Sequence, residues 1–220
     1  MYKVCQQFPL SCNSPLIIQP VFWIPWLGFI VISYFFIDQP LAHYLKEVQI
    51  AHPLLVIAFS KINSLGVSRN YLLILAAIFL WLFFISKNKI MSLWILYIML
   101  SLIVSGLFCM LFKVLCGKAR PNEWLHYHIY GFYFWRFENE FWSFPSGHVT
   151  TVSAVAAASY RVFRRFLGLW ILIVSAVMFG RMICLDHYLG DVMAGAYLGF
   201  ITSYLVYRVF TKALFSNHLS

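Results

Sequence analysis

Long apolar runs separated by short polar turns constrain this chain more than any other feature of its sequence. Of its 220 residues, 62% are hydrophobic and 10% are charged. Soluble domains average about 45–50% apolar and about 25% charged residues, and a soluble core of this size could not remove so much apolar surface from water. We therefore predict an all-α membrane protein that is surrounded by lipid over much of its length.

Six segments approach the length of about 20 mostly apolar residues that a helix needs to cross a bilayer. They are Val21–Ile37, Tyr71–Ile85, Ile90–Phe112, Gly147–Tyr160, Phe166–Gly180 and Val192–Tyr207. Several are shorter than a full span, so we expect their ends to extend into the polar flanks. The prediction is a bundle of six transmembrane helices in a single membrane-embedded domain, residues 1–220, with residues 1–20 as a short cytoplasmic segment.

A moderately apolar stretch, His52–Leu65, lies between the first two predicted spans. Pro53, Lys61 and Asn63 argue against a seventh span, which stays open as the alternative. We favour a helix that lies in the membrane interface.

The charged residues predict how the bundle is oriented. The formal charge is +9, but the cations are scattered singly between apolar runs, which favours a membrane over a nucleic-acid partner. With the N-terminus inside and six spans, all seven acidic residues fall on the outer side, together with eight Lys and Arg residues. The other basic residues fall on the cytoplasmic side, where the positive-inside rule expects them: Lys3, Lys87, Lys89, Arg161, Arg164, Arg165, Arg208 and Lys212. We predict that both termini are cytoplasmic.

Three polar clusters interrupt the apolar runs, and the predicted topology brings all three to the outer face. The first lies at the end of the third predicted helix, the second at the start of the fourth, and the third between the fifth and the sixth. In order, they are Lys113 to Arg120-Pro121, Pro145-Ser146-Gly147-His148, and Gly180-Arg181 to His187 and Asp191.

The first chemical prediction is an anion site. Lys113, Arg120 and Arg181 are cations at or near membrane depth, where isolated charges are costly and usually functional. Together they could hold a dianionic group, and the planar guanidinium suits phosphate oxygens. Ser146 and Gly147 add the free N–H groups of a helix start, where the backbone and the helix dipole favour an anion.

The second chemical prediction is a nucleophile with its partners. His187 and Asp191 are spaced i, i+4, so on a helix they would share a face, and the carboxylate would fix the tautomer of the imidazole. The other ring nitrogen would then be free to attack phosphorus. His148, from another helix, could protonate the leaving alcohol. Because phosphoryl transfer needs mainly positioning and charge stabilisation, we expect neither a metal ion nor another cofactor.

The three clusters resemble the three-part signature of the type 2 phosphatidic acid phosphatase superfamily: Lys113-x6-Arg120-Pro121, Pro145-Ser146-Gly147-His148 and Arg181-x5-His187-x3-Asp191. The resemblance implies a six-helix membrane core and the removal of phosphate from lipid phosphates and diphosphates through a phosphohistidine. It implies that His187 is the nucleophile, Asp191 its orienting carboxylate and His148 the general acid. It assigns phosphate binding to Lys113, Arg120, Ser146, Gly147 and Arg181.

Other residues near the motifs have plainer interpretations. Gly180 stands where the third motif of the family usually has serine, so a hydroxyl contact is lost while the following arginine is kept. We interpret Lys118 as a solvated or headgroup-facing charge and Asp186 as a surface residue. His126 and His128 lie in the loop between the motifs, either at the interfacial surface or in contact with substrate.

The aromatic loop Trp124–Phe144 predicts a position at the membrane surface, either as an interfacial belt or as a wall that guides the headgroup of the substrate.

Candidate substrates are phosphatidic acid, phosphatidylglycerophosphate, polyprenyl diphosphate and a lipid A phosphate. We expect a bacterial inner membrane with the active site on its periplasmic or outer face. Rival functions remain open. A membrane anion or phosphate-lipid transporter, or a binding protein on the same site, would also place cations at membrane depth, but a transporter would predict inverted repeats. A vanadate-dependent haloperoxidase would share the phosphate-site signature, but those relatives are soluble.

Overall fold

The structure is a computed structural model that describes residues 20–216, and the regular elements in this range are helices. In chain order they are α2 (Pro20–Ile32), α3 (Asp38–Ala51), α4 (Pro53–Ile62), α5 (Ser68–Leu80), α6 (Lys89–Cys116), α7 (Pro121–Tyr127), α8 (Gly147–Phe163), α9 (Leu167–Ile183) and α10 (Leu189–Ser216). Short π- or 3-10-helical turns extend or join them at η2 (Ser33–Ile37), η3 (Asn63–Gly66), η4 (Trp81–Ile85) and η5 (Asn139–Phe141). The predicted all-α class is confirmed for the described part of the chain.

Each of the six predicted spanning segments is helical over all or nearly all of its length. Four helical stretches are long and apolar enough to cross a membrane: Val21–Ala51, Ser68–Ile85, Lys89–Cys116 and Leu189–Leu214. The other two predicted spans correspond to α8 and α9, which have 17 residues each. The structure therefore supports a helical membrane protein, while the count of six spans stays a prediction.

α8 is the central helix of the bundle, although its sequence is less apolar than that of its neighbours. It packs against α6, α9 and α10, and most of its side chains are buried. A Cβ on Gly199 of α10 would lie 2.5 Å from the carbonyl oxygen of Thr150 in α8, so glycine is needed for the two backbones to come this close. α8 is surrounded by protein, which explains why it does not need a strongly apolar surface.

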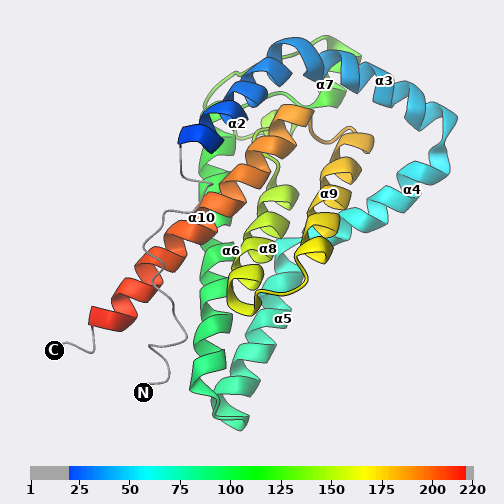
Figure 1. Cartoon of the computed structure of the whole chain (residues 1–220). Coiled ribbons are helices and arrows are strands. Elements are labelled where there is room, and N and C mark those ends of the chain that lie inside the picture. Colours follow the sequence, from blue (N-terminus) through cyan, green and yellow to red (C-terminus); the bar gives the residue numbers. More distant parts are fainter. Residues whose placement is uncertain (1–19, 217–220) are drawn as a thin grey trace.

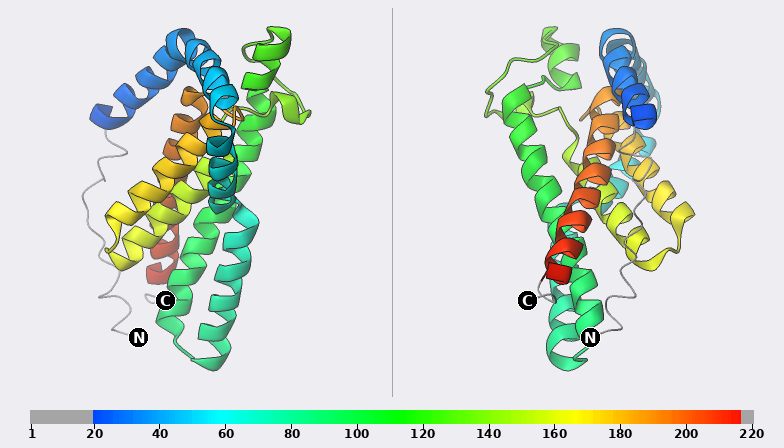
Figure 2. Two further views of the ribbon diagram at one scale, coloured as in Figure 1. Left: turned by 90° about the vertical axis from the view of Figure 1, so that its right-hand side faces the viewer. Right: turned by 60° about the vertical axis from the view of Figure 1, so that its left-hand side comes forward.

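α5 and α6 form a long hairpin (Figure 2) that exposes large apolar side chains. Leu73 of α5 and Leu107 of α6 are 65% and 67% exposed. Large apolar side chains with this exposure are expected on a surface that faces lipid.

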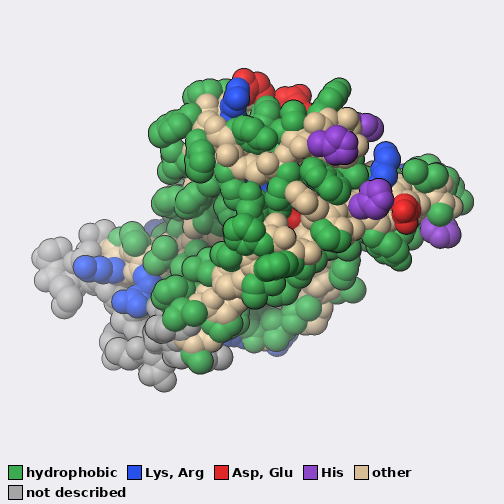
Figure 3. All heavy atoms as spheres, turned by 90° about the horizontal axis from the view of Figure 1, so that it is seen from above, with side chains coloured by type: hydrophobic (Ala, Val, Ile, Leu, Met, Phe, Trp, Pro, Cys, Tyr) green, Lys and Arg blue, Asp and Glu red, His purple; other side chains and the backbone are tan. Residues whose placement is uncertain are grey.

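α2 and α3 cross over the end of the bundle at which α6 and α9 end and α8 and α10 begin (Figures 1 and 2). Seen from that end, the surface is mostly hydrophobic, with small groups of acidic, basic and histidine side chains (Figure 3). The opposite end carries the α5–α6 and α8–α9 turns, which hold the basic residues Lys87, Arg164 and Arg165.

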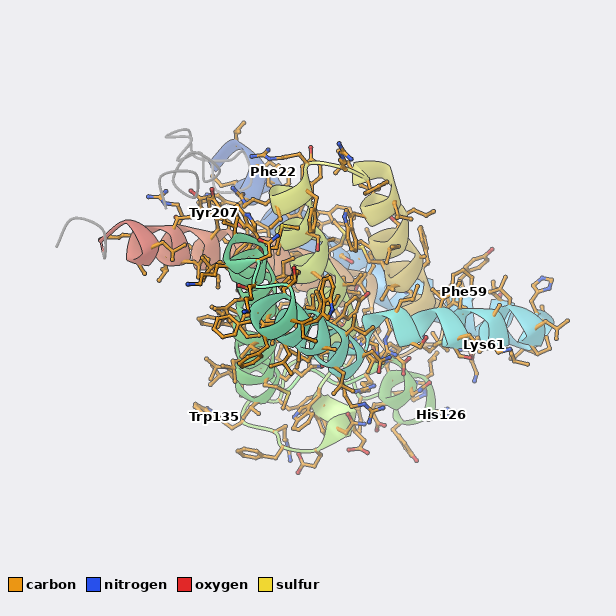
Figure 4. All side chains as sticks on the ribbon, turned by 90° about the horizontal axis from the view of Figure 1, so that it is seen from below. Phe22, Phe59, Lys61, His126, Trp135 and Tyr207 are labelled. Carbon is orange, nitrogen blue, oxygen red and sulfur yellow. The ribbon has the colours of Figure 1, made fainter. Side chains whose placement is uncertain are left out.

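The segment between the first two predicted spans forms two helices, α3 and α4. The predicted interfacial stretch His52–Leu65 makes α4 and most of η3, and both elements pack against α9. Phe59 and Lys61 lie on α4, to one side of the bundle (Figure 4). The depth of α4 in a bilayer stays a prediction. The predicted cytoplasmic segment 1–20 lies outside the described residues except for Pro20.

Candidate active site

The structure brings the three polar clusters together at the end of the bundle covered by α2 and α3 (Figure 1). Lys113 is in the last turn of α6, and its Cε lies 3.6 Å from the position that a Cβ on Gly147 would take at the start of α8. The backbone N–H of Ser146 donates to the carbonyl of Asp191 in the first turn of α10 (3.1 Å). The convergence expected from the topology is therefore observed.

His187 lies in the short loop between α9 and α10, and only 3% of it is exposed. Its Nδ1 is 2.7 Å from the backbone carbonyl oxygen of Ser143. A carbonyl can only accept a hydrogen bond, so this contact places the proton on Nδ1 and leaves a lone pair on Nε2. Nε2 is therefore the ring nitrogen that is free to attack an electrophile.

The surroundings of His187 keep its imidazole neutral. Burial lowers the pKa of His187 well below its usual value, because the imidazolium would lose its hydration. The cations Lys113, Arg181 and Arg120 lower the same pKa further by repulsion, and the hydrogen bond to Ser143 opposes the shift. The ring therefore carries no charge near pH 7, which is the state that a nucleophile requires.

Asp191 is placed differently from what its spacing suggested. α10 begins at Leu189, so His187 precedes the helix and does not share a helical face with Asp191. The Asp191 carboxylate accepts hydrogen bonds from Ser143 Oγ (2.6 Å) and from the backbone N–H of Tyr188 (3.0 Å). Asp191 therefore holds Ser143, and Ser143 in turn holds His187.

Lys118 is not the solvated or headgroup-facing charge that the sequence suggested. Its side chain is 1% exposed, and its Nζ lies 2.8 Å from both Asp38 Oδ2 and Asp191 Oδ1. Burial by itself would lower the pKa of Lys118, but the two carboxylates raise it above its ordinary value, so the ammonium stays charged. The interpretation was wrong because Asp38, the first residue of α3, lies 80 residues earlier in the chain, and no local pattern reveals this contact.

Arg120 and Arg181 are linked by one carboxylate. The guanidinium of Arg181 lies 3.0 Å from Asp186, and that of Arg120 lies 3.7 Å from it. Arg120 also donates to the carbonyl and side-chain oxygens of Asn139, at 2.8 Å each. Asp186 is 29% exposed, so it is near the surface as expected, but it also joins two of the predicted phosphate-binding cations.

Several hydrogen-bond donors at this site are not used by the protein itself. Within residues 20–216, Ser146 Oγ and Arg181 Nε are buried and have no hydrogen-bond partner. The first N–H groups of a helix also lack partners within the helix, and α8 begins at Gly147 beside Lys113. Because unpaired buried donors are costly, their gathering next to a neutral histidine indicates a site for an anion.

The aromatic loop has a half-buried part and an exposed part. The ring of Tyr130 packs near Lys118, whereas Tyr127, Trp135 and Phe137 are exposed. His126 and Trp135 lie on opposite sides of this region (Figure 4). The exposed rings fit both predicted interpretations of the loop, the interfacial belt and the substrate-guiding wall. His126 and His128 are exposed as well.

Residues 94–215 match the family model of the PAP2 superfamily. The chain belongs to this superfamily. The matched region is more than half of the chain and contains every predicted site residue, so the family that the three motifs suggested is confirmed.

Among PAP2-related proteins, the chain is 34% identical to the lipid A 1-phosphatase of Rhizobium johnstonii over 116 residues, 53% of this chain and 48% of that protein. It is 37% identical to the lipid A 1-phosphatase of Rhizobium etli over 119 residues, 53% of this chain and 50% of that protein. It is 27% identical to the lipid A 4'-phosphatase of Porphyromonas gingivalis over 168 residues, 74% of this chain and 70% of that protein. The chain thus spans about half the length of the two Rhizobium relatives.

Two solved structures share the fold. A transmembrane PAP2 type phosphatidylglycerolphosphate phosphatase from Bacillus subtilis has a TM-score of 0.63 and 20% identity, covering 96% of this chain and 98% of that one. The crystal structure of Aquifex aeolicus LpxE has a TM-score of 0.56 and 19% identity, covering 80% of this chain and 98% of that one. At these identities the likeness shows the PAP2 fold alone.

The structure explains why the PAP2 signature departs at Gly180. A Cβ there would lie closer than 3.0 Å to Oδ1 of Asn63, a buried residue in η3. The Asn63 amide donates to the Gly180 carbonyl and to Cys184 Sγ, at 3.4 Å each. A Cβ on Gly66, in the same turn, would lie 2.5 Å from the Cβ of His148. Turn η3 therefore fills the space of a serine side chain and also packs against the predicted general acid.

Three residues of this site were missed in the sequence. Asp38 directly follows an apolar run, and an acidic residue in that position was an available signal. Ser143 lies two residues before the second motif, and Asn63 lies 117 residues from its partner Gly180. Nothing in the neighbouring sequence indicates that Ser143 or Asn63 belongs to the site.

Proposed function

We propose that this PAP2 protein is a membrane lipid phosphatase that removes a phosphate group from lipid A, or from a lipid with a similar headgroup, through a phosphohistidine on His187. Three relatives carry the names of lipid A phosphatases, and these names favour lipid A over the other predicted substrates. The observation that carries the proposal is the arrangement of unpaired donors and three cations around a neutral, buried imidazole.

The reaction has two steps. In the first, Nε2 of His187 attacks phosphorus while the bond between phosphorus and the lipid oxygen breaks, and His148 donates a proton so that the lipid leaves as an alcohol. In the second, a water molecule attacks the phosphohistidine and gives a proton to His148. The bond between Nε2 and phosphorus breaks, and phosphate leaves with the enzyme restored.

Charge stabilisation comes from the residues around the phosphate. Lys113, Arg120 and Arg181 would balance the negative charge of its oxygens, and Ser146 Oγ would donate a hydrogen bond to one of them. The Nδ1–H contact with the Ser143 carbonyl would stabilise the positive charge that the ring of His187 gains as the phosphohistidine forms. No step in this scheme requires a metal ion.

We propose six spans with both termini in the cytoplasm and the active site on the periplasmic face of a bacterial inner membrane. The positions of Lys87, Arg164 and Arg165 at the end of the bundle opposite the site support this orientation. The phosphate-binding end would then open toward the outer leaflet, from which a lipid headgroup could enter.

The test is phosphate release by the purified protein in detergent from lipid A, phosphatidic acid, phosphatidylglycerophosphate and polyprenyl diphosphate. We expect the highest kcat/KM with lipid A and a loss of more than about 10³-fold in His187→Ala. EDTA should not reduce the rate, and a loss in EDTA would contradict metal independence. A folded wild type that releases no phosphate from any lipid would refute the phosphatase, and binding of lipid A without release would favour a transport or binding protein. Equal rates in His187→Ala would refute the nucleophile alone.

A further inference from the structure

Ser143 connects the Asp191 carboxylate to His187. Ser143 is fully buried, and each of its three polar groups is engaged. Its N–H donates to the carbonyl of Lys118 (3.0 Å), its Oγ donates to Asp191 (2.6 Å), and its carbonyl accepts from Nδ1 of His187 (2.7 Å). A residue that is bonded at three points has little freedom to shift, so the position of its carbonyl is well defined.

Lys118 closes a ring of contacts around Ser143. Its backbone carbonyl accepts the Ser143 N–H, and its Nζ binds the Asp191 carboxylate at 2.8 Å. Lys118 therefore holds Ser143 directly through the backbone and indirectly through Asp191. Movement of the Lys118 ammonium would shift Asp191, then Ser143, and finally the imidazole of His187.

Asp38 ties this ring to the helices that cover the site. Its carboxylate lies 2.8 Å from Lys118 Nζ and accepts hydrogen bonds from Ser33 Oγ (2.7 Å) and from the N–H of Gly190 (3.0 Å). Four aromatic rings surround the ammonium, with centroids 4.6–5.8 Å from Nζ: Tyr34, Tyr130, Phe132 and Tyr188. The cation is thereby fixed by two carboxylates and by contacts with aromatic faces.

A contribution to folding stability is a weak explanation for the buried cluster of Lys118, Asp38 and Asp191. Buried ion pairs cost desolvation energy, and apolar residues of similar volume often replace them without loss of stability. Here one ammonium and two carboxylates are buried at 0–1% side-chain exposure, two hydrogen bonds away from His187. A cluster with this cost and this location points to a role in positioning.

We infer that Ser143 is a positioning residue for His187, and that Lys118 and Asp38 hold it in place through Asp191. This inference rests on the proposed function, because it concerns His187 as the nucleophile. It differs from a direct contact between Asp191 and His187, since the carboxylate acts through the Ser143 hydroxyl and backbone.

The main test is Ser143→Ala, which removes one oxygen atom and keeps both backbone groups. Displacing a reacting group by a fraction of an ångström to 1 Å costs up to about 100-fold in rate, so we expect kcat with lipid A to fall about 10- to 100-fold. KM should stay within about twofold of wild type, because the phosphate-binding cations are untouched. Ser101→Ala is the matched control. Ser101 is also fully buried, and its hydroxyl donates to the carbonyl of Tyr97 in its own helix, so kcat should not change.

A second variant, Lys118→Met, tests whether Lys118 acts on His187 through Ser143. It is measured alone and combined with Ser143→Ala. If both residues act through the same contacts, the double variant should have the kcat of the slower single variant and not the product of the two effects. A double variant whose loss in kcat is the product of the two single losses would overturn the shared route. A kcat of Ser143→Ala within twofold of wild type, or a loss through KM alone, would overturn the inference while wild-type activity still upheld the phosphatase. An inactive wild type would instead mark the failure of the proposed function.

Discussion

Gly180→Ala tests whether turn η3 fills the space beside the third motif. The added Cβ would lie closer than 3.0 Å to Asn63 Oδ1 and 3.3 Å from the ring edge of Phe59. The ring can move by a few tenths of an ångström, but the Asn63 amide would have to leave its contacts with Gly180 and Cys184. Overpacking of this kind costs about 1–3 kcal/mol, whereas alanine in a helix interior gains about 0.5–1 kcal/mol over glycine.

A double-mutant cycle with Asn63→Ala separates the two effects. With Asn63 removed, the space is open, and Gly180→Ala should stabilise the protein by about 0.5–1 kcal/mol because only the helix preference remains. In the wild-type background the same change should be destabilising or neutral. The coupling should be about 1–3 kcal/mol, which corresponds to roughly 2–12 °C in Tm for a chain of this size. Thermal unfolding of the four purified proteins in one detergent measures it.

The control for this cycle is Gly106→Ala in α6, where nothing lies within 4 Å of the added Cβ. It reports the helix preference alone and should not depend on Asn63. Arg181 follows Gly180 directly, so Gly180→Ala should also reduce kcat/KM, and the double variant should recover part of it. If Gly180→Ala has the same effect on Tm with and without Asn63, the steric explanation for the missing serine is wrong.

Two further predictions concern charge at the site. Because burial lowers the pKa of His187 in the folded protein, the unfolded chain binds an additional proton below about pH 6.5. The stability of wild type should then fall by about 1.4 kcal/mol per pH unit as the pH drops from there toward the folded-state pKa. Tm should decrease less steeply in His187→Gln, and parallel decreases would contradict the buried neutral ring. Asp186→Asn removes the carboxylate that pairs with Arg120 and Arg181, and it should tighten inhibition by orthovanadate roughly 1.5- to 5-fold. Weaker inhibition would mean that Asp186 positions the arginines instead of competing with phosphate.

The sequence predicted the helices well because lipid imposes a simple requirement on length and apolarity. All six predicted segments are helical, and the motif clusters meet at one end. α8 was the hardest to predict because it is buried in protein, where small side chains matter more than hydropathy. The bend from α2 through η2 into α3 was not predicted, since it depends on packing over α10 and not on a local break in the apolar pattern.

The candidate site divides into residues that we propose face the anion and residues that hold them. The first group was predicted from the sequence, but of the second group only Asp191 was. Residues such as Arg120 and His187 carry unusual chemistry at a fixed spacing, which a sequence displays directly. Ser143 and Asn63 are ordinary polar residues whose roles come from contacts 44 and 117 positions away. Lys118 was misinterpreted for the same reason, because a lysine in a loop is usually solvated and its carboxylate partners Asp38 and Asp191 lie 80 and 73 positions away.

Asp191 lies at the predicted site, but its contacts differ from those that its spacing suggested. The i, i+4 spacing suggested a shared helical face, yet His187 precedes α10 and the carboxylate binds Ser143, Lys118 and the N–H of Tyr188. Spacing identified Asp191 because the loop and the first turn of α10 keep it near His187 by either route. A direct contact and a contact through Ser143 have different consequences for the neighbouring residues. A direct contact would leave Ser143 and Lys118 free to vary, whereas the observed contacts make the position of His187 depend on both.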